Sequence, residues 1–151
     1  MEDSENLQRD LETLYKWTED NNMCFNSSKF ELLRYGGNIS IKENTSYTTS
    51  TGEIIEEKYH VKDLGIFMSN TAEFIKHINH ITSRTSQLSA WILRTFQSRE
   101  FIVMLTLWKS LVLSIFNYCS QLYNPSKVSH IQQLEMIQRS YIRKINGMNK
   151  L

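Results

Sequence analysis

The fold is decided by residues 74–144, which read FIKHINHITSRTSQLSAWILRTFQSREFIVMLTLWKSLVLSIFNYCSQLYNPSKVSHIQQLEMIQRSYIRK. Apolar residues here recur at intervals of three, four or seven, the pattern of helices that each bury one face. A first stripe runs from Phe74 to Ile92, and a broader, more apolar one runs from Met104 to Phe116. These two stripes predict two helices, of which the second is the more deeply buried.

A third helix is predicted to start at Asn124-Pro125. Asn is a good N-cap, and Pro is tolerated at the first helical position. Its apolar stripe extends to Ile145, and Gly147 is placed to end it. Short connections between the three helices predict a compact three-helix bundle.

The preceding residues are mixed in structure. A helix is predicted over residues 5–19, with Ser4 as its N-cap, and a strand over residues 30–35. The polar loop 42–51 predicts a hairpin. Ile39 and Ile41 precede this loop, and a returning strand is predicted after it at 54–59. Another strand is predicted over residues 60–69, with Gly65 inside it. The fold class is therefore α+β, with a helix and a small antiparallel sheet in residues 1–70 and a helical bundle in residues 71–151.

Charge divides the chain at the same place. Residues 71–151 hold ten Lys or Arg and three acids, a net charge of +7, whereas residues 1–70 hold seven bases and thirteen acids, a net charge of −6. A basic helical part beside an acidic part indicates a polyanionic partner for the helices. The alternative is an ordinary solvated helix surface, which on charge alone is about equally good.

Other features of the composition exclude several classes of protein. Cys24 and Cys119 lie far apart without metal-ligand spacing, which indicates buried thiols in a reducing compartment. No apolar run has the length of a membrane span, so we expect no membrane partner. The N-terminus, Met-Glu-Asp-Ser, is the opposite of a signal peptide, which predicts an intracellular protein, cytoplasmic or nuclear.

Several ordered motifs resemble one protein family. Leu14-Tyr15-Lys16-Trp17, followed by residues 22–33 (NMCFNSSKFELL), resembles the fourth conserved palm motif of reverse transcriptases from non-LTR retrotransposons of the LINE-like, jockey type. Residues 61–66 (VKDLGI) resemble the fifth motif, the primer-grip hairpin of these enzymes. Residues 107–112 (LWKSLV) and 132–139 (QQLEMIQR) resemble segments that follow in jockey-like elements.

The resemblance implies the end of a polymerase palm in residues 1–70 and a thumb in residues 71–151. The complete family enzyme is an RNA-directed DNA polymerase that uses Mg²⁺, held by the Tyr-x-Asp-Asp turn and a third carboxylate. This sequence contains no Asp-Asp pair. We therefore expect a fragment that begins after the catalytic centre, has no cofactor or metal site of its own, and is inactive alone.

The resemblance also implies site residues. Lys29 matches a palm lysine that lies beside the incoming nucleotide. In the family this lysine neutralises phosphate charge or protonates the leaving pyrophosphate. The alternative for this chain, which lacks a metal site, is an ordinary loop lysine. Leu64 and Gly65 match the primer grip, although a glycine in a twisted edge strand is about equally good. No residue of this chain is predicted to be catalytic by itself.

Candidate nucleic-acid contacts come from the basic helices. Each phosphate contact adds about 0.9 to the salt slope of binding. For Arg139, Arg143 and Lys144, the alternative is a favourable interaction with a helix C-terminus, worth about 0.3–1 kcal/mol each. The predicted set is Arg94, Arg99, Lys109, Arg139, Arg143 and Lys144.

Two further groups are assigned to structure. Trp91, Trp108 and Tyr141 resemble a stacking platform, but helical spacing favours core positions by about four to one. His77 and His80 lie three apart without further ligands, so no metal site is predicted.

The predicted function is binding of an RNA/DNA primer–template. The alternative is a non-catalytic helical interaction module, which self-associates through an exposed apolar surface.

Overall fold

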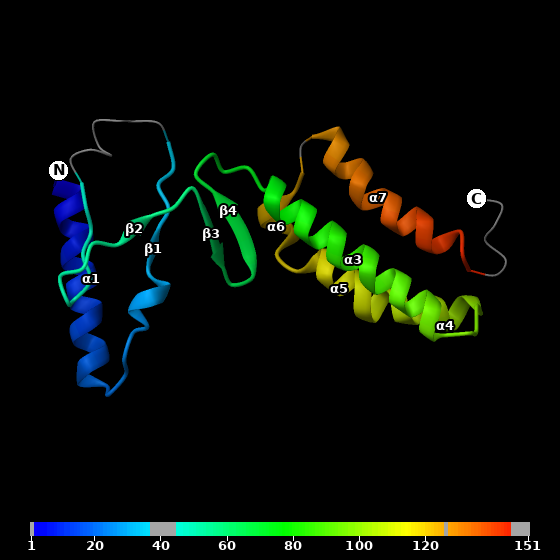
Figure 1. The fold of residues 1–151 in the computed structure, drawn as a ribbon, viewed down its shortest axis with the longest axis horizontal. Coiled ribbons are helices and arrows are strands. Elements are labelled where there is room, and N and C mark those ends of the chain that lie inside the picture. Colours follow the sequence, from blue (N-terminus) through cyan, green and yellow to red (C-terminus); the bar gives the residue numbers. More distant parts are fainter. Residues whose placement is uncertain (1, 37–44, 126, 146–151) are drawn as a thin grey trace. The chain divides into compact units, whose positions relative to one another are not determined.

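The computed structural model describes residues 2–36, 45–125 and 127–145. The chain divides into two compact units, residues 1–72 and residues 73–151, which we call the N-terminal unit and the helical unit. Figure 1 shows a helix and short strands in the first unit and helices alone in the second. The predicted α+β class, with an N-terminal helix, a small antiparallel sheet and then several helices, is confirmed.

Helix α1 (Glu2–Asp20) organises the N-terminal unit. It begins earlier than predicted, so Ser4 lies inside the helix rather than at its N-cap. The acidic residues Glu2, Asp3 and Glu5 in the first turn favour this early start, because negative charge stabilises a helix N-terminus. Its buried Tyr15 packs edge-on against Phe25, with ring centroids 5.1 Å apart, and fixes the segment that follows the helix.

The strands after α1 are shorter than predicted. A 3-10 turn, η1 (Ser27–Lys29), leads into β1 (Glu31–Leu32), which pairs in parallel with β2 (Glu56–Glu57). The antiparallel return predicted for residues 54–59 is therefore wrong. An antiparallel bridge, Thr48 with Ile54, closes a turn that reverses the chain immediately before β2, so β2 runs in the direction of β1. Ile39 and Ile41, predicted as the first arm of a hairpin, lie outside the described residues.

The small antiparallel sheet is the hairpin of β3 (His60–Asp63) and β4 (Ile66–Ser69). Asp63 pairs with Ile66, so Leu64 and Gly65 form the two-residue turn, with φ of +46° and +89°. A two-residue turn with positive φ at both positions has a backbone twist that matches the twist of the two strands. The single strand predicted through Gly65 is wrong, because the glycine turns the chain instead of continuing it.

The described residues of the helical unit form three long helical segments. Helix α3 (Ile75–Thr95) is followed by a continuous run of α4 (Phe101–Leu107), the π-helical segment η2 (Trp108–Val112) and α5 (Leu113–Asn117). A short α6 (Ser120–Tyr123) precedes α7 (Val128–Ile142). The third helix thus starts later than predicted, because Asn124 ends α6 instead of capping α7, and Gly147 lies outside the described residues.

The π segment explains how the second run buries one face. Met104, Trp108 and Val112 are all buried at a spacing of four residues. Four residues of an α-helix overshoot a full turn by about 40°. The wider π turn rotates less per residue and compensates for that overshoot. All three side chains therefore reach the same core.

Two apolar clusters among the described residues hold the helical unit together. One contains Ile92, Met104, Trp108, Val112, Ile137, Tyr141 and Ile145, and the other contains Ile78, Ile81 and Tyr123. Trp108 and Tyr141, with ring centroids 4.7 Å apart, are core residues as predicted. Trp91 is exposed, so its assignment to the core is wrong. Among the described residues, no helix combines the length and apolar character that crossing a membrane requires.

Candidate nucleic-acid interface

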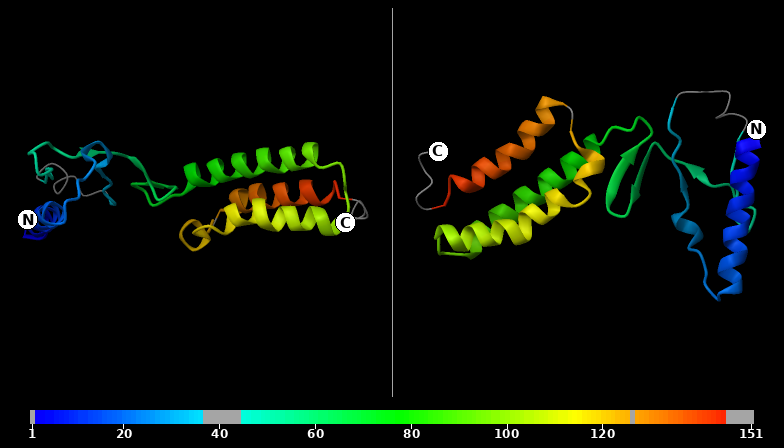
Figure 2. Two further views of the ribbon diagram at one scale, coloured as in Figure 1. Left: turned by 90° about the horizontal axis from the view of Figure 1, so that it is seen from below. Right: turned by 180° about the vertical axis from the view of Figure 1, so that it is seen from behind.

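Helices α3 and α7 run in the same direction and finish at the same end of the helical unit, as Figures 1 and 2 show. Ile78 and Ile81, early in α3, share a cluster with Leu134 of α7. Ile92, late in α3, shares the other cluster with Tyr141, late in α7. Residues near the two C-termini are therefore gathered at one end.

That end is basic. Arg94 lies in the last turn of α3, and Arg143 and Lys144 directly follow α7; all three side chains are exposed. Helix α3 has no acidic residue along its whole length. We call Arg94, Arg143 and Lys144 the basic end. Lys144 also lines a small groove between α3 and α7 of about 90 Å³, together with Ser86 and Ser140.

Arg99 is engaged in the fold. Its half-buried guanidinium donates hydrogen bonds to the carbonyl oxygens of Leu93 and Phe96. These are carbonyls of the last turn of α3 and of its C-cap, which lack partners of their own within the helix. Arg99 therefore caps α3 and holds the connection to α4, and its remaining capacity for a phosphate is small.

The other predicted basic residues lie elsewhere on the unit. Arg139 donates to Glu135 one turn earlier on α7, with Nη2 and Oε2 2.8 Å apart. Lys109 is exposed on the π segment. The structure thus brings three of the six predicted contacts together at the basic end. Arg99, Arg139 and Lys109 do not belong to this group.

The residues predicted from the palm motifs belong to the N-terminal unit. Lys29 is exposed and closes the 3-10 turn η1, where its backbone N–H donates to the Asn26 carbonyl at 3.0 Å. Leu64, with 81% of its surface exposed, and Gly65 form the tip of the β3–β4 hairpin. Their roles toward nucleotide and primer stay predictions.

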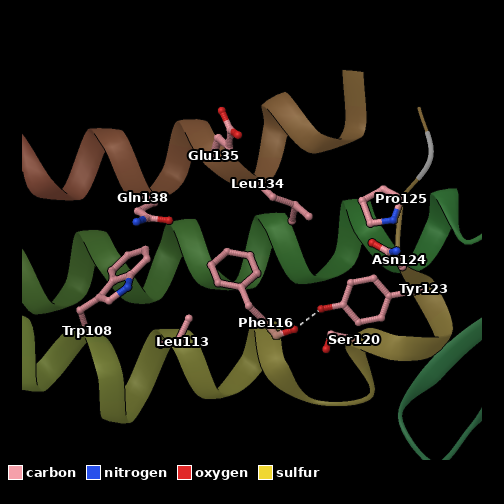
Figure 3. A pocket seen from close by; sticks show the side chains of 10 residues that line it. All are labelled: Trp108, Leu113, Phe116, Ser120, Tyr123, Asn124, Pro125, Leu134, Glu135 and Gln138. Atoms are coloured by element: carbon pink, nitrogen blue, oxygen red, sulfur yellow. Dashed lines mark hydrogen bonds between the residues drawn. The ribbon is translucent and has the colours of Figure 1, made fainter. Parts of the chain in front are cut away.

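Sequence reasoning missed an apolar pocket, which Figure 3 shows between the α4–α5 run, α6 and α7. Its volume is about 270 Å³. Leu134 and Gln138 reach into it from α7, whereas the Glu135 carboxylate points away. The Tyr123 hydroxyl donates to the Phe116 backbone carbonyl, which fixes the Tyr123 ring in the wall. The sequence carries no local signal for the pocket, because its lining comes from three separate segments of the chain.

A buried histidine lies behind this wall. His77 is 2% exposed, its ring lies 4.8 Å from that of Tyr123, and neither imidazole nitrogen has a hydrogen-bond partner among the described residues. Burial, and secondarily the charge of His80, lower the pKa of His77 below its usual 6.5. The described residues contain no group of three His, Cys, Asp or Glu side chains that could hold a metal ion.

Similarity to known proteins gives this arrangement a context. The chain is 22% identical over 145 residues to the RNA-directed DNA polymerase from mobile element jockey of Drosophila melanogaster, covering 93% of this chain and 15% of that protein. It is 20% identical over 151 residues to the jockey polymerase of Drosophila funebris, covering 97% of this chain and 16% of the relative. An uncharacterized protein of Caenorhabditis elegans is 29% identical over 85 residues, which are 56% of this chain and 43% of that protein. No protein-family profile and no solved structure matches the chain.

Two of these relatives align with almost the whole chain. The chain is related to RNA-directed DNA polymerases. More particularly, it is related to the reverse transcriptase of jockey-type non-LTR retrotransposons, and it spans about 15% of the length of those enzymes.

Proposed function

We propose that the helical unit binds the primer–template duplex of a retrotransposon reverse transcriptase through its basic end. In this proposal, residues 1–70 are the end of the polymerase palm, residues 71–151 are its thumb, and the protein works inside the cell, where its nucleic acid is. The observation that carries the proposal is the parallel arrangement of α3 and α7, which gathers Arg94, Arg143 and Lys144 at one end.

Several physical features support phosphate binding there. Arginine and lysine neutralise backbone phosphates and release condensed counterions, which supplies sequence-independent affinity. The three side chains are exposed, and the net charge of residues 71–151 is +7. Three phosphate contacts would give a salt slope of about −2.7, at about 0.9 per contact.

The proposal assigns binding and no chemistry to this chain. The described residues form no group of carboxylates that fits Mg²⁺, and the sequence has no Asp-Asp pair. Two-metal phosphoryl transfer requires such close-set carboxylates. We therefore propose that polymerisation needs parts that lie outside the aligned region.

Fluorescence anisotropy with a labelled RNA/DNA duplex at several salt concentrations tests the proposal. The chain should bind with an affinity that falls as salt rises and that is independent of duplex sequence. The double variant Arg143→Gln/Lys144→Gln should reduce the magnitude of the salt slope by about 1.8. The matched control Arg9→Gln/Lys16→Gln removes two exposed charges from α1 and should leave the slope unchanged. Equal losses in both variants, or no salt-sensitive binding at all, would overturn it.

A second candidate function rests on the surface of α1. Leu7, Leu14 and Trp17 are 47%, 52% and 54% exposed and form an apolar stripe beside the buried face of the helix. Exposed apolar stripes of this kind mark interaction sites. This favours the alternative of a helical interaction module, which self-associates or binds a protein partner through α1.

A further inference from the structure

We propose that the pocket between the π segment, α6 and α7 binds a single unstacked nucleobase. This inference rests on the proposed function, because the nucleic acid held at the basic end is the source of the base. It adds a contact to the base itself, whereas the basic end reads only phosphates. Proteins that bind single-stranded segments commonly pair phosphate contacts with aromatic side chains that receive splayed-out bases.

The size of the pocket restricts its occupant. Its volume of about 270 Å³ lies just below the range of about 300–1,000 Å³ in which drug-sized ligands bind. A compact ring system therefore fits it better than an extended ligand. The lining is mostly apolar and includes three aromatic rings, those of Trp108, Phe116 and Tyr123.

The aromatic wall is held in place before any ligand arrives. Trp108 packs against Tyr141, with ring centroids 4.7 Å apart, and lies 6.3 Å from Phe116. Tyr123 is held on one side by its hydrogen bond to the Phe116 carbonyl and on the other by the His77 ring. A wall whose side chains are already ordered loses little entropy when a ring packs against it.

The π segment supports a binding role by its position. Trp108 is its first residue, and Leu113 directly follows its last. π turns within α-helices are rare and frequently occur at functional sites. Here Trp108 belongs to the π turn and also lines the pocket, so the π turn directly shapes part of the pocket wall.

The polar groups of the pocket favour a nucleobase over an apolar side chain. Gln138, Asn124 and Ser120 supply uncharged donors and acceptors at its lining, and the Glu135 carboxylate points away. A base edge carries both donors and acceptors and can satisfy these groups. A phenylalanine or leucine side chain could use none of these exposed groups, so a nucleobase gains hydrogen bonds that an apolar side chain does not.

Tryptophan fluorescence provides a direct test, because the chain has three tryptophans and two of them, Trp17 and Trp91, are exposed. The double variant Trp17→Phe/Trp91→Phe leaves Trp108 as the sole reporter. Titration of this full-length variant with adenosine monophosphate should quench Trp108 saturably, and ribose 5-phosphate, which lacks the base, should not. Absence of saturable quenching, or equal quenching by ribose 5-phosphate, would overturn the inference.

Two further arms identify the occupant. Gln138→Leu in the same background should weaken the binding of adenosine monophosphate by about tenfold, a change within the range of a glutamine hydrogen-bonded to a base edge. Gln132→Leu is the matched control, since Gln132 is exposed on α7 and does not line the pocket. Quenching by an N-acetylated phenylalanine amide that equals or exceeds that of the nucleotide would assign the pocket to a protein side chain instead.

Single-stranded oligonucleotides with and without bases separate this inference from the proposed function. Tighter binding of the base-bearing strand, lost in Gln138→Leu, supports both. Equal, salt-sensitive binding of the normal and abasic strands would overturn the base pocket and leave the basic end in place. Binding of the free nucleotide without salt-sensitive binding of any oligonucleotide or of the RNA/DNA duplex would overturn the proposed function while the pocket stands.

Discussion

The Tyr141 hydroxyl of α7 donates a hydrogen bond to the Met104 carbonyl of α4, 3.0 Å away. Tyr141 and Met104 are both buried, so this bond joins the two helices inside the larger apolar cluster. It also holds the end of α7 that carries Arg143 and Lys144. This hydrogen bond adds a directed contact to the apolar packing that positions the basic end.

We expect Tyr141→Phe to destabilise the helical unit by about 1 kcal/mol, because the hydrogen bond is lost while the ring is kept. Urea denaturation followed by circular dichroism measures this change. The control Tyr35→Phe, at an exposed site in the other unit, should change stability by less than about 0.5 kcal/mol. If Tyr141→Phe has no more effect than this control, the hydrogen bond does not join the two helices as described.

His77 should make the helical unit sensitive to acid. Its pKa is lowered in the folded state, so the folded protein resists protonation while the unfolded chain accepts a proton near pH 6.5. The stability linked to His77 is complete above pH 6.5 and is lost as the pH falls from there toward the lowered pKa. Denaturation midpoints measured between neutral and mildly acidic pH should fall, and His77→Phe should flatten that fall. A variant with the same pH dependence as the parent would exclude His77 as the cause.

The helices were more predictable from the sequence than the turns, for a physical reason. The stripe of α3 was visible because Ile78, Ile81 and Ile92 keep the helical period and are all buried. The π segment was not visible in the sequence, because its buried residues still recur every four positions, which an ordinary α-helix also allows. The left-handed residues Leu64 and Cys119 were hidden as well, since neither is a residue type that favours positive φ.

The candidate site was only partly predictable. Composition gave the basic character of the helices, but only the parallel course of α3 and α7 showed which basic residues share an end. Arg99 could not be distinguished from Arg94 by sequence, because a guanidinium that caps a helix and one that faces solvent look the same there. The pocket depends on three segments meeting in space, which no local pattern encodes.

Leu64 is strained at its position in the hairpin. A left-handed conformation costs an L-residue other than glycine about 1–2 kcal/mol, and asparagine tolerates it better. We therefore expect Leu64→Asn to stabilise the hairpin by about 0.5–1 kcal/mol and Gly65→Ala to destabilise it. Hydrogen exchange of the β3 and β4 amides measures both changes. If Leu64 contacts a primer end, Leu64→Asn should also weaken duplex binding although the hairpin is more stable, whereas unchanged affinity would remove Leu64 from the interface.

The two units should differ in local stability. In the described part of the chain, the helical unit has two clusters of buried apolar residues. The described residues of the N-terminal unit bury the apolar side chains of Tyr15, Ile55 and Ile66 and form two-stranded sheets. Amides in α3 and α7 should therefore exchange more slowly than the described amides of residues 30–68. Equal or greater protection in residues 30–68 would contradict this expectation.

The apolar stripe of α1 should drive association of the isolated chain. Leu7, Leu14 and Trp17 lie beside the helix face that buries Tyr15, so they remain available to a partner. Sedimentation velocity should show oligomers that dissociate on dilution, and Leu7→Gln/Leu14→Gln should shift the chain to monomer, because polar side chains remove the gain from burying this stripe. The control Leu122→Gln/Met136→Gln replaces two exposed apolar residues of the helical unit and should leave the oligomers intact. A monomeric parent chain, or an equal shift in both variants, would exclude α1 as the interface and leave nucleic-acid binding as the better supported function.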